Sequence, residues 1–143
     1  DRASTEAAVD RAHKLAGELR ETEAALSKTS ELMGAVVQYA KTRPVFDGYK
    51  AARYSKKYLA QHEAELADYR AAKATMSDLL GGAKLLKMDA LKKERRELSE
   101  KRKALYAEYR KAQAEMRQAV AVKANIDHLL GHTDGRENKA QER

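Results

Sequence analysis

Residues 39–58 read YAKTRPVFDGYKAARYSKKY and separate two long stretches with the patterning of helices. This segment, which we call the basic-aromatic corner, holds five of the eight aromatic residues of the chain. It carries six positive charges against one negative charge, and it contains Pro44, the only proline. Because proline disfavours the helical conformation at the residue before it and has no amide donor, the sequence predicts that a first long helix ends at Thr42.

The corner is also expected to start the helices that follow. Pro44 suits the first turn of a short helix, and Ser55 can cap the next long one. Gly81 and Gly82 form a strong stop and reversal signal, and Gly131 ends the last helical pattern. The sequence therefore predicts helices at residues 4–42, 44–53, 56–80 and 88–130, in a helical domain of residues 1–131, with a polar disordered tail at 132–143.

Three of these segments carry an apolar seam, a row of positions spaced three or four residues apart. This 3.5-residue repeat keeps one stripe of a helix facing a partner helix. The first seam comprises Ala8, Ala12, Leu15, Leu19, Thr22, Leu26, Thr29, Met33, Val36 and Ala40. The second comprises Leu59, His62, Leu66, Tyr69, Ala72, Met76 and Leu79. The third comprises Leu91, Arg95, Leu98, Arg102, Leu105, Tyr109, Ala112, Met116, Ala119, Lys123, Ile126 and Leu130.

The predicted fold is therefore all-α: an elongated antiparallel helical bundle or coiled coil of three long helices, with one short helix at the corner. The composition agrees, because 36% of the 143 residues are charged and Ala, Glu, Lys, Leu and Arg dominate. The helices differ in length, so one end of the first or last helix should project or pair with a second molecule. Arg95, Arg102 and Lys123 on the third seam indicate incomplete burial there.

Charge and composition limit the classes of function. A net charge of +7 favours polyanionic partners. The absence of cysteine excludes disulfide frameworks, thiolate metal sites and cysteine nucleophiles, and fits a cytoplasmic location. No apolar run reaches the roughly 18 residues that span a bilayer, so we expect no membrane insertion. We expect an internal or C-terminal piece of a longer protein.

The basic-aromatic corner has the chemistry of a nucleic-acid site. Lysine and arginine neutralise phosphates, and tyrosines can stack on the bases of single strands. The alternative is that the aromatic rings pack inside the corner while the charged side chains stay in water. The sequence favours this alternative for most of the rings. The candidate phosphate-binding residues are Lys41, Arg43, Lys50, Arg53, Lys56 and Lys57.

A second basic region spans residues 84–111, with eleven basic and five acidic side chains. The pairs Glu97–Lys101 and Glu100–Lys103 have spacings that allow ion pairs within a helix, so a solvated helix face is the favoured interpretation. The weaker candidates for DNA binding in this region are Lys92, Lys93, Arg96 and Lys103.

Signals for catalysis are missing. His128 and His132 are four residues apart, but the predicted helix end between them preorganises a metal site poorly. The sequence contains no nucleophile elbow, phosphate loop or zinc signature. We therefore expect no enzymatic activity in this chain, no metal site and no cofactor.

Several short motifs occur in order along the chain. The corner contains Y-x-K-T-R-x-V-[FY]-x-x-Y at residues 39–49 and Y-S-K-K-[FY] at 54–58. H-x-x-E and A-A-K follow at 62–65 and 71–73, and A-E-Y-R-x-A-x-x-E-M lies at 107–116. Over residues 32–130 the chain resembles the helical C-terminal region of the relaxase, or mobilisation nuclease, family of Gram-positive conjugative plasmids and transposons. Pro44 stands where that family more often has an acidic residue.

The resemblance implies a role in conjugative DNA transfer. The parent protein of such a family nicks DNA with a tyrosine and a histidine-held metal in an N-terminal domain, and no residue of this chain matches that motif. The implied function is therefore a non-catalytic accessory domain in the bacterial cytoplasm that aids DNA binding or assembly of the transfer complex. The alternative is a coiled-coil module that binds a second copy or a transfer-apparatus protein without contacting DNA.

Overall fold

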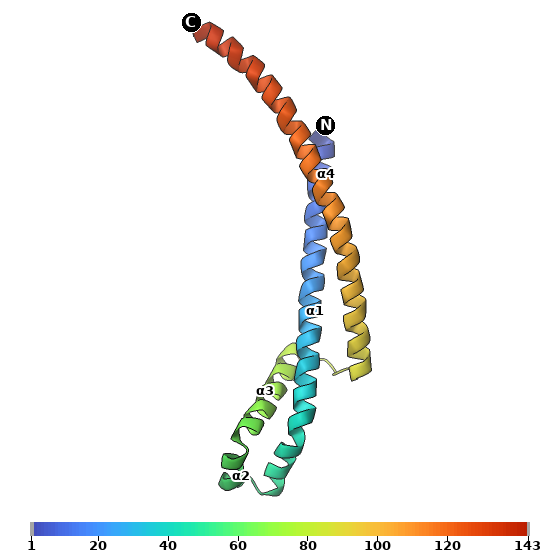
Figure 1. Cartoon of the computed structure of the whole chain (residues 1–143), viewed down its shortest axis with the longest axis vertical. Coiled ribbons are helices and arrows are strands. Elements are labelled where there is room, and N and C mark those ends of the chain that lie inside the picture. The colour runs from blue at the N-terminus through green and yellow to red at the C-terminus, as the bar shows by residue number, and fades with distance from the viewer. Residues whose placement is uncertain (1, 143) are drawn as a thin grey trace. The chain divides into compact units, whose positions relative to one another are not determined.

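In the computed structural model, the described backbone covers residues 2–142 and the described side chains residues 2–131. This part of the chain forms four α-helices and no strand. They are α1 (Arg2–Ala51), α2 (Lys56–Gln61), α3 (Glu63–Leu80) and α4 (Met88–Glu142) (Figure 1). None of the described helices combines the length and the apolar character that a membrane span requires.

The chain divides into two packing units, through both of which α1 and α4 pass. One unit comprises residues 1–22 and 100–143, and the other comprises residues 23–99. In each unit a part of α1 packs against a part of α4. The predicted class, an all-α helical bundle, is therefore confirmed.

In the first unit, α1 and α4 meet along small side chains. Ala12 of α1 and Ala112 of α4 are both 2% exposed. Small residues at such positions let helix axes approach closely. Arg11 of α1 forms an ion pair with Glu115 of α4 at the edge of this seam. Buried Thr22 donates its hydroxyl to the carbonyl of Glu18 at 2.8 Å, so its polar group is satisfied inside the seam.

The second unit has a core to which three helices contribute. Leu32 and Met33 of α1 are buried with Leu91 of α4, which is 2% exposed. Partly buried side chains surround these three: Val36, Met76, Leu79, Leu80, Leu85 and Met88. The predicted seam positions supply most of this core, which confirms that the 3.5-residue repeat marks the packed faces.

The structure differs from the prediction at Pro44, which lies inside α1. A proline in a helix removes one hydrogen bond and crowds the carbonyl four residues earlier. Here that carbonyl belongs to Ala40, and both residues are exposed, so water can solvate it. Packing holds the helix on both sides of Pro44, because Tyr39 and Phe46 stack on the same ring of α3. The predicted helix end at Thr42 and the separate short helix at residues 44–53 are therefore wrong.

The short helix lies instead at the start of the predicted third segment. Ser55 caps α2 as expected, since its hydroxyl accepts a hydrogen bond from the amide of Tyr58 at 3.3 Å. The segment then breaks at His62, whose φ of −124° and ψ of 25° separate α2 from α3. The predicted single helix at residues 56–80 is therefore two helices, which follow the end of α1 back along its side (Figure 1).

The glycine pair after α3 ends that helix as predicted. Gly81 and Gly82 have φ values of 54° and 89°, a left-handed conformation that glycine adopts without steric cost. α4 begins at Met88 as expected, and its bounds extend to Glu142 rather than to the predicted end at Leu130. The side chains of the predicted polar tail, residues 132–143, lie outside the described part of the chain.

Candidate functional site

The basic-aromatic corner is built on the C-terminal end of α1. The amide of Tyr54 donates to the carbonyl of Tyr49, and the amide of Arg53 donates to that of Lys50, both at 2.9 Å. These are the two hydrogen bonds of a Schellman helix end. The apolar contact that accompanies this motif is also present, since the Tyr49 and Tyr54 rings meet edge to face at 5.2 Å.

The helix end places two residues other than glycine in the left-handed region. Arg53 has a φ of 56° and Tyr54 a φ of 59°. Glycine is the usual residue at the first of these positions, because a Cβ atom is crowded there. The corner therefore keeps an arginine where glycine is sterically preferred, and such local strain is concentrated at functional sites in proteins.

One ring cluster joins α1 to α3. Tyr69 is 5% exposed and lies between Tyr39 and Phe46, with ring centroids 5.2 and 4.3 Å away. Burial raises the pKa of the Tyr69 hydroxyl above its ordinary value, and hydrogen bonding with Tyr39 adds to the effect, while the nearby charge of Arg43 opposes it. Tyr69 is thus a neutral, structural side chain.

A second ring cluster joins α1 to α2. The Tyr58 ring stacks on Tyr49 at 5.9 Å and lies 4.2 Å from the ring of His62. Its hydroxyl donates to the carbonyl of Val45 at 2.7 Å. This contact requires Gly48, because a Cβ atom there would overlap the Tyr58 hydroxyl and come within 3.0 Å of its Cζ.

Most of the aromatic residues of the corner are therefore used in packing. Tyr39, Phe46, Tyr49 and Tyr58 are buried or half-buried, whereas Tyr54 is 57% exposed. Sequence reasoning placed Tyr69 and His62 on a seam but did not connect them to the corner rings. Their helical spacing from Leu66 and Leu59 was the available signal. The packing interpretation holds for four of the five corner rings, and Tyr54 is left as the ring that is open to a ligand.

All six candidate cations of the corner are exposed. Within the described part of the chain, Asp47 is the only carboxylate that lies within ion-pair distance of any of them, 4.0 Å from Arg43 with both side chains about 60% exposed. Arg43 also lies over the Tyr39 ring and Lys50 over the Phe46 ring, at 6.0 and 5.9 Å. The corner thus presents positive charge that its own carboxylates leave largely uncompensated.

The helix distributes these cations over two flanks. Arg43 and Lys50 are seven residues apart, about two turns, so they share one side of α1. Lys41 is two residues from Arg43 and projects from the opposite flank. Arg53, Lys56 and Lys57 follow at the end of α1 and in the first turn of α2. Arg43, Lys50 and Asp47 border the ring stack on Tyr69. Arg43 and Asp47 also line a groove of about 350 Å³, together with Tyr39, Pro44 and Met76.

The weaker candidates lie on α4. Lys92, Lys93 and Arg96 belong to the second unit and Lys103 to the first, and all four side chains are exposed. The pairs Glu97–Lys101 and Glu100–Lys103 do not come within 4.0 Å in the described structure. These four cations lie on exposed positions of α4, although the ion pairs that the spacing allows are not formed.

Among residues 2–131, the structure assembles no group of three or more side chains that could hold a metal ion. Of the two histidines weighed in the sequence, His132 lies outside the described side chains. No family model, curated protein or solved structure matches this chain.

Proposed function

We propose that this chain is a non-catalytic helical domain that binds DNA through the basic-aromatic corner, as an accessory part of a relaxase in conjugative transfer. The observation that carries the proposal is the exposure of all six corner cations beside a single, equally exposed carboxylate. Phosphate oxygens are strong ligands for such side chains, and their neutralisation releases counterions. The motif resemblance supplies the biological setting, and the charge supplies the physical basis.

The backbone at the end of α1 supports the same site. Arg53 occupies a strained left-handed position that glycine would fill at lower cost. In that position it sits beside Tyr54, the exposed ring, and just before the cations of α2. A cation and an open aromatic face side by side are the elements with which proteins hold single-stranded nucleic acid.

The test is a titration of labelled single- and double-stranded DNA, followed by fluorescence anisotropy at several salt concentrations. The corner variant replaces all six cations with glutamine. If each cation contacts one phosphate of a duplex, the slope of log K against log salt should lose up to about 5 units. Loss of affinity should be similar for unrelated sequences, because phosphate contacts carry no sequence information.

A matched control separates the corner from the general charge of the chain. Six exposed cations outside both candidate groups can be replaced in the same way: Lys14, Arg20, Lys28, Lys101, Lys111 and Arg117. Both variants lower the net charge by six. The proposal requires the corner variant to lose markedly more affinity and more of the salt slope than the control. Equal losses in the two variants, or no binding of wild type to either form of DNA at low salt, would refute it.

A further inference from the structure

An apolar row on α4 stays exposed next to the start of α1. Val122, Ile126 and Leu130 are 54%, 51% and 61% exposed. They are spaced four residues apart, so they lie on one side of the helix. Nearer the middle of the unit, the corresponding face of α4 is covered, as the burial of Ala112 shows. The apolar row therefore lies on the continuation of a packed face of α4, and such exposed rows mark interaction surfaces.

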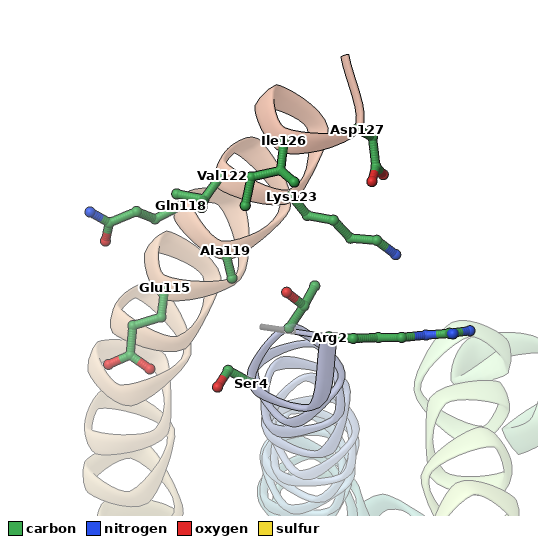
Figure 2. Close-up of a pocket in the computed structure, with 10 residues that line it drawn as sticks. Arg2, Ser4, Glu115, Gln118, Ala119, Val122, Lys123, Ile126 and Asp127 are labelled. Atoms are coloured by element: carbon green, nitrogen blue, oxygen red, sulfur yellow. The ribbon is translucent and has the colours of Figure 1, made fainter. Parts of the chain in front are cut away.

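Beside this row lies a groove of about 720 Å³ between the first turn of α1 and α4. Figure 2 shows Ala119, Val122 and Ile126 along the α4 side and Ser4 at the start of α1. The remaining lining residues are Arg2, Thr5, Glu115, Gln118, Lys123 and Asp127. An apolar floor with charges of both signs at its edge has the form of a site for an amphipathic helix.

The charges on the rim identify the helix that fits. Lys123 and Asp127 are one turn apart on the same flank of α4, and among residues 2–131 neither has an ion-pair partner. We propose that a second copy of this chain fills the groove, with the two α4 helices antiparallel about a two-fold axis near Asn125. Lys123 of each copy then faces Asp127 of the other, whereas a parallel pair would place Lys123 against Lys123.

The same register also matches the apolar residues. Ile126 lies one residue from the axis, so the two copies stack this side chain across it. Val122 of one copy reaches a level within about 3 Å of Leu130 of the other, because each residue adds 1.5 Å along the helix. The interface involves only a few turns of helix per copy. Small interfaces are typical of weak, transient complexes, so we expect a dimer that forms at concentrations on the order of micromolar.

Sedimentation velocity of the full chain, across concentrations from about 1 to 300 μM, measures this association. Wild type should shift from monomer to dimer within that range. Ile126→Lys should place two like charges beside the axis and weaken the dimer at least tenfold. Val37→Lys is the matched control, because Val37 is equally exposed, at 59%, but lies in the other unit, and it should leave association unchanged.

Charge reversal tests the antiparallel register. Lys123→Asp and Asp127→Lys should each weaken the dimer about tenfold or more, since each creates two like-charge contacts. The double variant, with both reversals, should recover wild-type association, because every pair again has opposite signs. All of these sites are exposed, and far-ultraviolet circular dichroism verifies that helicity is kept.

Three results would overturn the proposal. Wild type could remain monomeric at 300 μM, which would exclude a second copy as the occupant of the groove. Ile126→Lys could associate as strongly as wild type, which would place the interface elsewhere. The double charge reversal could fail to restore association, which would exclude the antiparallel register. None of these outcomes depends on DNA, so the DNA-binding proposal stands or falls separately.

Discussion

Gly48 is the residue at which a Cβ atom would collide with a packed side chain of the corner, that of Tyr58. Its missing Cβ lets the Tyr58 ring approach α1 and donate to the Val45 carbonyl. Alanine normally stabilises a helix interior by about 1 kcal/mol relative to glycine. At Gly48 the same substitution should instead lower the stability, because the new methyl group displaces Tyr58 and breaks its hydrogen bond.

Chemical denaturation of Gly48→Ala should therefore show a loss of about 1–2 kcal/mol in unfolding free energy. Gly34→Ala on the same helix is the control, since a Cβ there meets nothing within 4 Å. It should raise stability by up to about 1 kcal/mol. Two variants that change stability in the same direction would contradict the packing described for Tyr58.

Arg53 combines a strained backbone with a candidate phosphate contact. Arg53→Gly should stabilise the fold by about 1 kcal/mol, because it relieves the left-handed strain, while DNA affinity falls. Arg53→Ala keeps the Cβ atom, so it should lose the same affinity without the gain in stability. Thermal melts and anisotropy on both variants separate the two effects. A destabilised Arg53→Gly variant would argue against the helix end as described.

Tyr69 makes stability depend on alkaline pH. Its folded-state pKa is raised, mainly by burial. Above about pH 10 the unfolded chain loses this proton while the folded chain keeps it. Its contribution is therefore complete below pH 10 and is lost as pH rises through the folded-state pKa.

Between pH 9 and 11.5, the unfolding free energy of Tyr69→Phe should fall less steeply than that of wild type. The difference in slope should be up to about 1.4 kcal/mol per pH unit. Tyr54→Phe serves as the control, because it removes the same group at a position that is 57% exposed. If Tyr69→Phe and wild type decline in parallel, the buried hydroxyl has no part in the effect.

Among the helices, α1 shows how tertiary packing overrides a local stop signal. Pro44 costs on the order of 3 kcal/mol in a helix interior, yet α1 passes through it. Tyr39 precedes Pro44 in α1 and Phe46 follows it. Both rings stack on Tyr69 of α3, and these two contacts oppose a break in the helix. The helix is continuous because these contacts outweigh a missing hydrogen bond on the solvent side.

Pro44→Ala should therefore restore a hydrogen bond without disturbing any packed side chain. We expect a rise of about 1–3 kcal/mol in the unfolding free energy, measured by denaturant titration. Glu31→Ala, at another exposed position of α1, should change it by less than about 0.5 kcal/mol. A Pro44→Ala variant with no gain would mean that α1 is not helical on both sides of this position.

For the molecule as a whole, the division into two units predicts that residues 23–99 can fold without the rest of the chain. The core of Leu32, Met33 and Leu91 lies entirely within residues 23–99. A fragment of these residues should therefore keep a cooperative thermal transition in circular dichroism. Leu91→Ala in the same fragment should abolish it, because emptying a buried leucine site costs about 2–5 kcal/mol. A fragment that melts without cooperativity would show that the two units fold only together.

Much of the architecture could be predicted from residue order. The 3.5-residue repeat identified buried positions such as Ala12, Leu66 and Leu91, because a helix places residues three and four apart on one side. Ser55 and the Gly81–Gly82 pair were recognised because capping and left-handed turns depend on local chemistry. The exposure of the corner cations likewise followed from the cost of burying an unpaired charge.

Contacts between distant segments decided the rest. The continuity of α1 through Pro44 depends on Tyr69, which is 25 residues further along the chain. Four of the corner rings, which could have stacked on bases, are instead packed, because α2 and α3 fold back onto α1. A local sequence pattern shows which residues lie on one side of a helix. It does not show which side chain of another helix will stack on them, because that contact forms only when the helices pack together.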